Sequence, residues 1–224
     1  MWFFLGAGIL IGMRHALEAD HLAAVVALST RTRGRMATML RGAAWGLGHT
    51  TALLVVGGAS LALGTSLSQT SEQWLERAVG AMLILLGAQV IARLVRSRVR
   101  VSRHAHDGVV HIHAHAWGPQ AGASRLHHQH ADRSHVRAAL VGTVHGMAGS
   151  AALVVLTSAT AGSFWMGLAY IASFGAGSML GMAALSLAIS LPLELSARRL
   201  GHAYGLVEVP IACGTMVLGL WMLR

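Results

Sequence analysis

The sequence has few charged residues, no lysine and a single cysteine. Charged residues make up 11% of the 224 residues, whereas a soluble domain has about 25%. So little charge cannot cover a water-facing surface, which excludes an ordinary soluble protein. Because Cys213 is the only cysteine, an internal disulfide and a metal cage of several thiolates are excluded as well.

Long apolar runs make up most of the chain. Hydrophobic residues account for 54% of it, and the mean hydropathy is +0.59. A bilayer core about 30 Å thick requires about 20 apolar residues per helix. The runs that are long enough cover residues 2–28, 37–64, 73–95, 137–160, 164–191 and 202–223. We therefore expect an all-α integral membrane protein with about six transmembrane helices.

The arginines predict the orientation in the membrane. All 17 basic residues are arginine, and they cluster in the connections after the first, third and fifth runs. By the positive-inside rule these connections are cytoplasmic, so both termini lie outside. The formal charge of +9 then belongs to cytoplasmic loops and does not indicate a nucleic-acid partner. No basic segment precedes the first apolar run, so we expect no cleavable signal peptide.

The segment 97–136 differs in composition from the runs on either side. It contains nine histidines, which are His104, His106, His111, His113, His115, His127, His128, His130 and His135. The composition predicts a disordered cytoplasmic loop, and the His-x-His spacing predicts weak binding of divalent metals. Such a loop could collect metal for export, buffer imported metal, sense metal load or act only as a spacer. It separates a first half (1–96) from a second half (137–224), with three runs each.

The two halves share short similar segments. Gly12-Met-Arg-His15 resembles Gly142-Thr-Val-His145, and Trp45-Gly-Leu-Gly-His49 resembles Phe174-Gly-Ala-Gly-Ser178. The spacing between the two segments is nearly the same in both halves. Because each half has three runs, the second half enters the membrane from the opposite side. The sequence therefore predicts two inverted three-helix repeats, an arrangement in which transporters bind their substrate near the midplane.

The first run contains a cluster of polar side chains, namely His15, Glu18, Asp20 and His21. A charged residue at the centre of a membrane helix costs about 2.5–3.5 kcal/mol, so pairing, a water-filled cavity or a bound cation must offset this cost. At about 100° per residue, Asp20 points away from Glu18 in a straight helix. Either the helix is distorted, or Asp20 orients a histidine or pairs with Arg14. The alternative to a metal site is a packing cluster in which Arg14 pairs with a carboxylate.

Two further histidines, His49 and His145, lie in the middle of the second and fourth runs. Each taken alone is as consistent with packing as with metal binding. Together with His15 and His21 they form a candidate metal site, to which Asp20 or Glu18 would add negative charge. Imidazole ligands suit nickel, cobalt, zinc, copper and iron, whereas magnesium and calcium prefer oxygen ligands.

The segment from Arg14 to Val25 contains the pattern His-x4-Asp-His and resembles the signature of the nickel/cobalt transporter superfamily. Leu47-Gly-His-Thr50 resembles the second histidine segment of that superfamily, and the segment from His145 to Leu153 resembles its urease-accessory-like, six-span permease branch. The resemblance implies a permease of the bacterial inner membrane that transports Ni²⁺ or Co²⁺. It also implies His15, Asp20 and His21 as core motif residues, no permanently bound cofactor, and a functional link to urease or hydrogenase maturation.

Two directions of transport and two other classes of function remain open, a small-solute exporter and a metal-dependent hydrolase. A small-solute exporter would not need three intramembrane histidines. A potential of 100 mV gives a divalent ion roughly 4–5 kcal/mol on entry, so uptake is the simpler hypothesis. Efflux of nickel, cobalt or zinc would need imported protons, and the His-rich loop would collect cytoplasmic metal. An intramembrane metal-dependent hydrolase would need an activated water, but the sequence has no His-Glu-x-x-His pattern. We expect a transporter and not an enzyme, with a metal ion and the lipid bilayer as partners.

Overall fold

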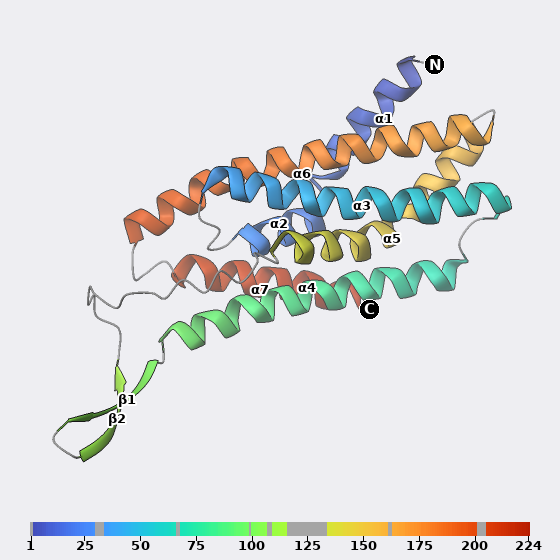
Figure 1. Ribbon diagram of the computed structural model, residues 1–224. Helices are drawn as coiled ribbons and strands as arrows, with labels where there is room; N and C mark the ends of the chain where they lie inside the picture. Colours follow the sequence, from blue (N-terminus) through green and yellow to red (C-terminus); the bar gives the residue numbers. More distant parts are fainter. Residues whose placement is uncertain are drawn as a thin grey trace.

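The computed structural model describes residues 2–29, 34–65, 68–98, 100–106, 109–115, 134–160, 163–200 and 205–224 (Figure 1). The helices in these segments are α1 (Trp2–His15), α2 (Ala19–Ser29), α3 (Arg35–Leu63), α4 (Gln69–Arg98), α5 (Ser134–Thr160), α6 (Phe164–Leu200) and α7 (Gly205–Met222). Two antiparallel strands, β1 (Arg100–His106) and β2 (Val109–His115), lie between α4 and α5 in the chain.

Four of the described helices, α3, α4, α6 and α7, are long and apolar enough to cross a membrane. α5 has a similar length, 27 residues, but the side chains of its residues 150–160 lie outside the described part. The chain is thus an α-helical, multi-pass membrane protein. The count of six spans stays a prediction.

The first apolar run, residues 2–28, forms two helices, so the distorted helix that the sequence left open as one alternative is present. α1 ends at His15 and α2 begins at Ala19. Between them, the backbone N–H groups of residues 17 and 18 bond to carbonyls three residues back, at 2.9 and 3.0 Å. These tighter bonds replace the four-residue spacing of an α-helix and turn the chain. Asp20 then lies in the first turn of α2, where the helix dipole favours a carboxylate.

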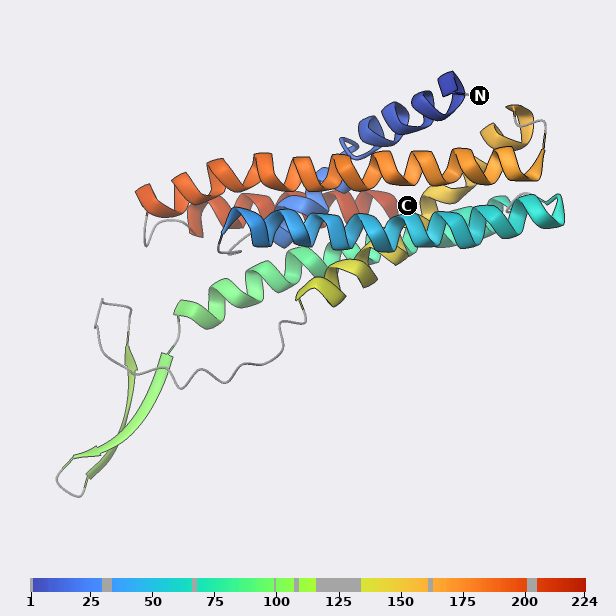
Figure 2. The same ribbon diagram turned by 45° about the horizontal axis from the view of Figure 1, so that its top comes forward.

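α3 packs against both α5 and α6. α1 packs along α6, and α4 pairs with α7. Figure 1 shows α3 and α6 on one side of the molecule and α4 and α7 on the other, and Figure 2 shows the same helices in a turned view. The short helix α2 contacts α4, α6 and α7, so it joins the two sides.

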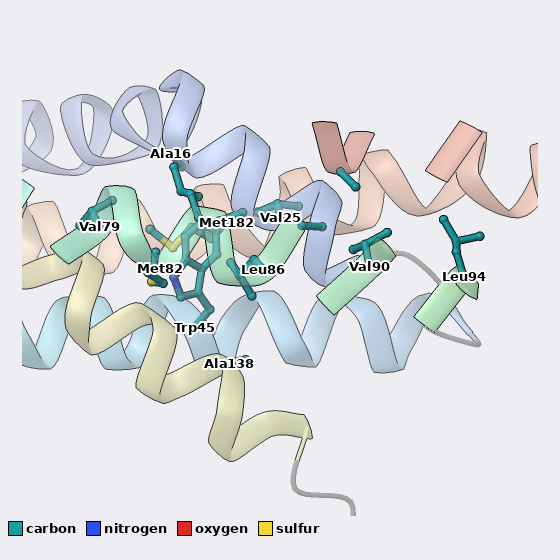
Figure 3. Close-up of a cluster of buried hydrophobic side chains, with 14 residues drawn as sticks. Ala16, Val25, Trp45, Val79, Met82, Leu86, Val90, Leu94, Ala138 and Met182 are labelled. Carbon is teal, nitrogen blue, oxygen red and sulfur yellow. The ribbon is translucent and has the colours of Figure 1, made fainter. Parts of the chain in front are cut away.

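The largest buried cluster of apolar side chains joins α2, α3, α4 and α7 with neighbouring residues of the other helices (Figure 3). Trp45 of α3 and Met182 of α6 are fully buried in it, and Met82 of α4 is buried beside them. A smaller cluster around Leu53 and Phe174 joins α3 to α6. Because lipid is as apolar as these side chains, close packing holds such helices together in a membrane.

Glycines let helix backbones touch at several places, two of which bear on the sequence match between the halves. A Cβ added at Gly12 of α1 would overlap the carbonyl oxygen of Phe174 in α6, and one added at Gly142 of α5 would overlap the carbonyl oxygen of Trp45 in α3. The two contacts correspond under the sequence match of the halves, in which Gly12 aligns with Gly142 and Phe174 aligns with Trp45. The same pair of positions therefore meets twice in the molecule, each time with one member from each half.

α3 and α6, the helices that carry Trp45 and Phe174, run antiparallel. Arg35 at the start of α3 lies 4.0 Å from the Glu194 carboxylate near the end of α6. At the other end, a Cβ added at Gly58 of α3 would lie 3.4 Å from Leu168, in the second turn of α6. The two helices that carry the matched segments thus point in opposite directions.

Part of the His-rich segment is regular, so the expectation of disorder is wrong for residues 100–106 and 109–115. These residues form a hairpin with His104 opposite His111. Its valine and isoleucine residues favour an extended backbone. In addition, α4 continues to Arg98 and α5 begins at Ser134, so both helices extend into the predicted 97–136 loop.

Candidate metal centre

Three histidine rings from three helices meet inside the protein. His15 ends α1, His21 lies in the first turn of α2, and His49 lies at the centre of α3. One ring nitrogen from each lies within 4.8 Å of the other two. The ring centroids are separated by 4.4 Å (His15 to His21), 5.4 Å (His15 to His49) and 5.2 Å (His21 to His49). We call these three residues the histidine triad.

The triad contains buried ring nitrogens without hydrogen-bond partners. They are Nε2 of His15, Nε2 of His21 and both nitrogens of His49. Buried polar side-chain atoms are nearly always hydrogen-bonded, because leaving one unpaired costs about 1–3 kcal/mol. Several such atoms facing one another form a set of free lone pairs in a site closed to water. A divalent transition metal is a chemical partner that suits this arrangement.

The break between α1 and α2 brings the first two histidines together. In a straight helix, residues 15 and 21 would be six positions apart and separated along the axis by about 9 Å. The turn after His15 lets its ring approach His21 edge-on instead. The distortion that the sequence allowed as one possibility is therefore present.

Asp20 lies beside the triad and contacts two histidines. Its Oδ1 is 3.1 Å from His21 Nδ1 and accepts the backbone N–H of the same residue at 2.8 Å, and its Oδ2 is 2.8 Å from His145 Nε2. An ionised carboxylate only accepts hydrogen bonds, so His21 Nδ1 and His145 Nε2 carry the protons. The lone pair of His21 is then on Nε2, toward the triad. Such a carboxylate fixes the tautomer and the orientation of a metal-binding histidine.

Glu18 has the same relation to His15. Its Oε1 lies 3.0 Å from His15 Nδ1, which directs the lone pair of that ring to Nε2. The Glu18 side chain is 58% exposed, whereas that of His15 is only 15% exposed. Glu18 therefore lies at the exposed edge of the cluster, with the triad behind it.

His145 of α5 belongs to a second group with Asp20 and His21. One potential ligand atom from each of these three residues lies within 4.8 Å of the others. Its ring centroid is 4.0 Å from that of His21 but 6.0 Å from that of His49. The predicted set of four histidines thus divides into two overlapping groups.

Arg14 does not fit the alternative of a packing cluster. Its side chain is exposed, and within the described part of the chain it forms no ion pair with Asp20 or Glu18. The two carboxylates bond to histidines instead. An ion-paired cluster centred on arginine therefore does not account for the arrangement.

Three residues near the site escaped the sequence reasoning. The Phe174 ring lies 5.3 Å from His15, and the Trp45 ring lies 5.6 Å from His145. Gly149 of α5 faces the triad, since a Cβ added there would contact the rings of His15 and His49 at 3.7 and 3.9 Å. Phe174 and Trp45 are the first residues of two matched segments, and this match was the sequence signal that could have pointed to them. For Gly149 the sequence signal is its position one turn after His145.

The nine histidines of the 97–136 segment lie apart from this cluster in the chain and only partly within the described residues. Five lie on the hairpin strands, and His135 lies at the start of α5. His127, His128 and His130 lie outside the described residues. An auxiliary metal-binding role for the segment stays a prediction.

The family described as cytochrome c biogenesis protein transmembrane region matches residues 21–214. This match covers most of the chain, from α2 to α7. The chain belongs to this family. A related protein, the urease accessory protein UreH of Bacillus sp. (strain TB-90), is 34% identical over 196 residues, which are 88% of this chain and 80% of the relative. No solved structure matches the chain.

The family match includes His21, His49 and His145 but begins after His15. Neither name is that of an enzyme, and the relative's name associates it with urease. The expected urease-accessory relationship is therefore borne out at the level of a related membrane protein. A nickel or cobalt substrate and a transport activity stay predictions.

Proposed function

We propose that this protein transports a divalent transition-metal ion, most favourably Ni²⁺ or Co²⁺, across the bacterial inner membrane. The observation that carries the proposal is the histidine triad, with unpartnered ring nitrogens of His15, His21 and His49 buried among the helices. A transported ion would bind these nitrogens, while Asp20 and Glu18 hold two of the rings in the required tautomer.

The chemistry of the triad supports a borderline metal. Imidazole nitrogens suit nickel, cobalt and zinc, whereas an all-oxygen set would suit magnesium or calcium. Nickel is favoured by the resemblance of the His-x4-Asp-His segment to nickel/cobalt transporters. The urease association of the relative's name supports the same choice.

We further propose that the chain consists of two inverted repeats that rock about the site. The reciprocal Gly12–Phe174 and Gly142–Trp45 contacts support this arrangement, as does the antiparallel packing of α3 on α6. In transporters of this plan, one half moves against the other around a fixed midplane site. The proposed topology has six spans, both termini outside and the His-rich segment in the cytoplasm.

The direction of transport can be tested in cells that express the protein. We expect cellular nickel to rise, because the membrane potential draws a divalent cation inward by roughly 4–5 kcal/mol per 100 mV. The measurement is total cell nickel, cobalt, zinc and manganese after incubation with each metal, against cells that express the His49→Leu variant. A fall in cell nickel would instead indicate proton-driven efflux. Unchanged content of all four metals would contradict the transport proposal.

Deleting residues 104–133 separates the triad from the His-rich segment. This deletion leaves α4 and α5 intact. We expect purified protein to lose weak nickel binding but to keep one tight site, because the triad lies in α1, α2 and α3. Nickel titration with and without the deletion measures both classes of site. Loss of all nickel binding on deletion would place the ion on the segment and not on the triad.

A further inference from the structure

The cluster offers two groups of potential ligands and not one. The first is the histidine triad, and the second consists of Asp20, His21 and His145. His21 belongs to both groups. The two potential positions are therefore adjacent. A neutral imidazole has one acceptor nitrogen at a time, so His21 can bind an ion in only one of the two positions.

We propose that the two groups are successive positions for one transported ion, which passes between them by exchanging ligands around His21. This inference rests on the proposed transport of a transition-metal ion and specifies its path. The first position is the triad, and the second is the Asp20–His21–His145 group.

Each position has a carboxylate that is more exposed than the histidines beside it. Glu18 is 58% exposed and bonds to His15 of the triad, whose side chain is 15% exposed. In the second position Asp20 is 23% exposed, whereas the His21 side chain is 1% and the His145 side chain 3% exposed. Because Glu18 is the more exposed carboxylate, we place the entrance beside it, so that an ion meets His15 first and His145 later.

The two positions differ in charge. The triad consists of three imidazoles and contributes no negative charge when they are neutral. The second group includes the Asp20 carboxylate, which lies 2.8 Å from His145 Nε2 and 3.1 Å from His21 Nδ1. Attraction to this carboxylate offsets part of the cost of breaking these two hydrogen bonds, so a divalent cation can reach the second position from the triad, which stays the tighter site. The low dielectric of a buried site strengthens that attraction.

The hydrogen bonds of Asp20 allow the exchange without net gain or loss of protons. When the ion takes His21 Nδ1 and His145 Nε2, the protons on those atoms move to the opposite ring nitrogens, carried by a water molecule from the hydration shell of the ion. These are His21 Nε2, which the ion has just left, and His145 Nδ1, and neither has a hydrogen-bond partner. Asp20 then exchanges two hydrogen bonds for bonds to the cation.

The two positions also differ in the helices that they join. All residues of the triad lie in the first half of the chain, on α1, α2 and α3. The second group adds His145 of α5 and so links the two proposed halves. Passage of the ion from the first position to the second therefore transfers it from one half to the contact between halves, which is where a rocking motion could release it.

Nickel binding and nickel transport by the full chain should separate in matched variants. We expect His49→Leu to weaken equilibrium binding by more than about 100-fold and to abolish transport. We expect His145→Leu to weaken binding by no more than roughly 10–100-fold, an effect typical of a residue outside the coordination sphere, yet to abolish transport at saturating nickel. Binding is measured on detergent-purified protein, and transport in proteoliposomes that enclose a nickel-sensitive dye.

Asp20→Asn provides a second test that preserves side-chain volume. It keeps a polar side chain beside His21 but removes the negative charge of the second position. Transport at saturating nickel should fall while nickel still raises the thermal stability of the variant, which also shows that it is folded.

The proposal is overturned if His145→Leu loses binding as severely as His49→Leu, since this result would mean that all four histidines bind the ion at a single position. It is also overturned if both His145→Leu and Asp20→Asn transport at the wild-type rate. Wild-type protein that neither binds nor transports nickel would instead overturn the proposed function.

Discussion

His49→Leu should make the metal-free protein more stable and at the same time abolish nickel binding. His49 is fully buried and neither ring nitrogen has a hydrogen-bond partner. Each unsatisfied buried polar group costs about 1–3 kcal/mol, and leucine has a similar volume without that cost. Wild-type protein should melt at a higher temperature when nickel is added, whereas the variant should not respond. The loss of affinity should exceed the roughly 10–100-fold effect typical of residues outside the coordination sphere.

The matched control is Thr51→Ala on the same helix. Thr51 is exposed and its hydroxyl donates only to the Leu47 carbonyl one turn earlier. This variant should keep both nickel binding and the nickel-dependent rise in melting temperature. A His49→Leu protein that is less stable without metal, yet retains the nickel response, would show that the histidine is a packing residue.

Gly12→Ala and Gly142→Ala should each destabilise the protein strongly and to a similar extent. At both positions the new methyl group would overlap a backbone carbonyl oxygen of the neighbouring helix, that of Phe174 or that of Trp45. Overpacking costs about 1–3 kcal/mol when side chains can adjust. Backbone atoms cannot rotate away, so the helices must separate and we expect a cost at or above the upper end of this range. The measurement is the melting temperature and the yield of monodisperse protein in detergent.

Gly214→Ala is the matched control for both glycine variants. Gly214 lies in α7, and an added Cβ would meet no atom within 4 Å. Alanine is favoured over glycine in a helix by about 1 kcal/mol, so this variant should be as stable as the wild type or slightly more stable. If only one of Gly12→Ala and Gly142→Ala were destabilising, the two contacts would not be equivalent and the proposed repeat would lose its main support.

The helical break after His15 illustrates how far the sequence could lead. The polar cluster was apparent from composition, and helical geometry showed that a straight helix could not direct all its members to one ion. The geometry left two explanations open, a distorted helix or a separate role for Asp20. Both are present, because the turn moves His15 toward His21 while Asp20 bonds to His21 and His145. The role of Asp20 depended on its hydrogen bond with His145 of α5, a helix far from Asp20 in the chain.

The hairpin in the His-rich segment shows where composition was misleading. Low hydrophobicity and many polar residues predicted disorder over 97–136, yet residues 100–115 pair as two strands across a gap at 107–108. The local run of valine and isoleucine was the signal for an extended backbone. A composition average over the whole segment concealed it, because the average includes the polar residues that follow the second strand.

The sequence by itself determined that this is a helical membrane protein with ionisable side chains inside it. Apolar runs too long for a soluble domain and scarce charge lead to that conclusion through the thickness and polarity of the bilayer alone. Only the tertiary structure decided that His15, His21 and His49 meet, and that His145 joins His21 through Asp20 instead of joining the triad. Which histidines meet depends on the three-residue turn between α1 and α2 and on helix packing at glycines such as Gly142. A single methyl group at such a glycine would shift a helix. Such contacts between distant segments cannot be derived from periodicity, which describes only one helix at a time.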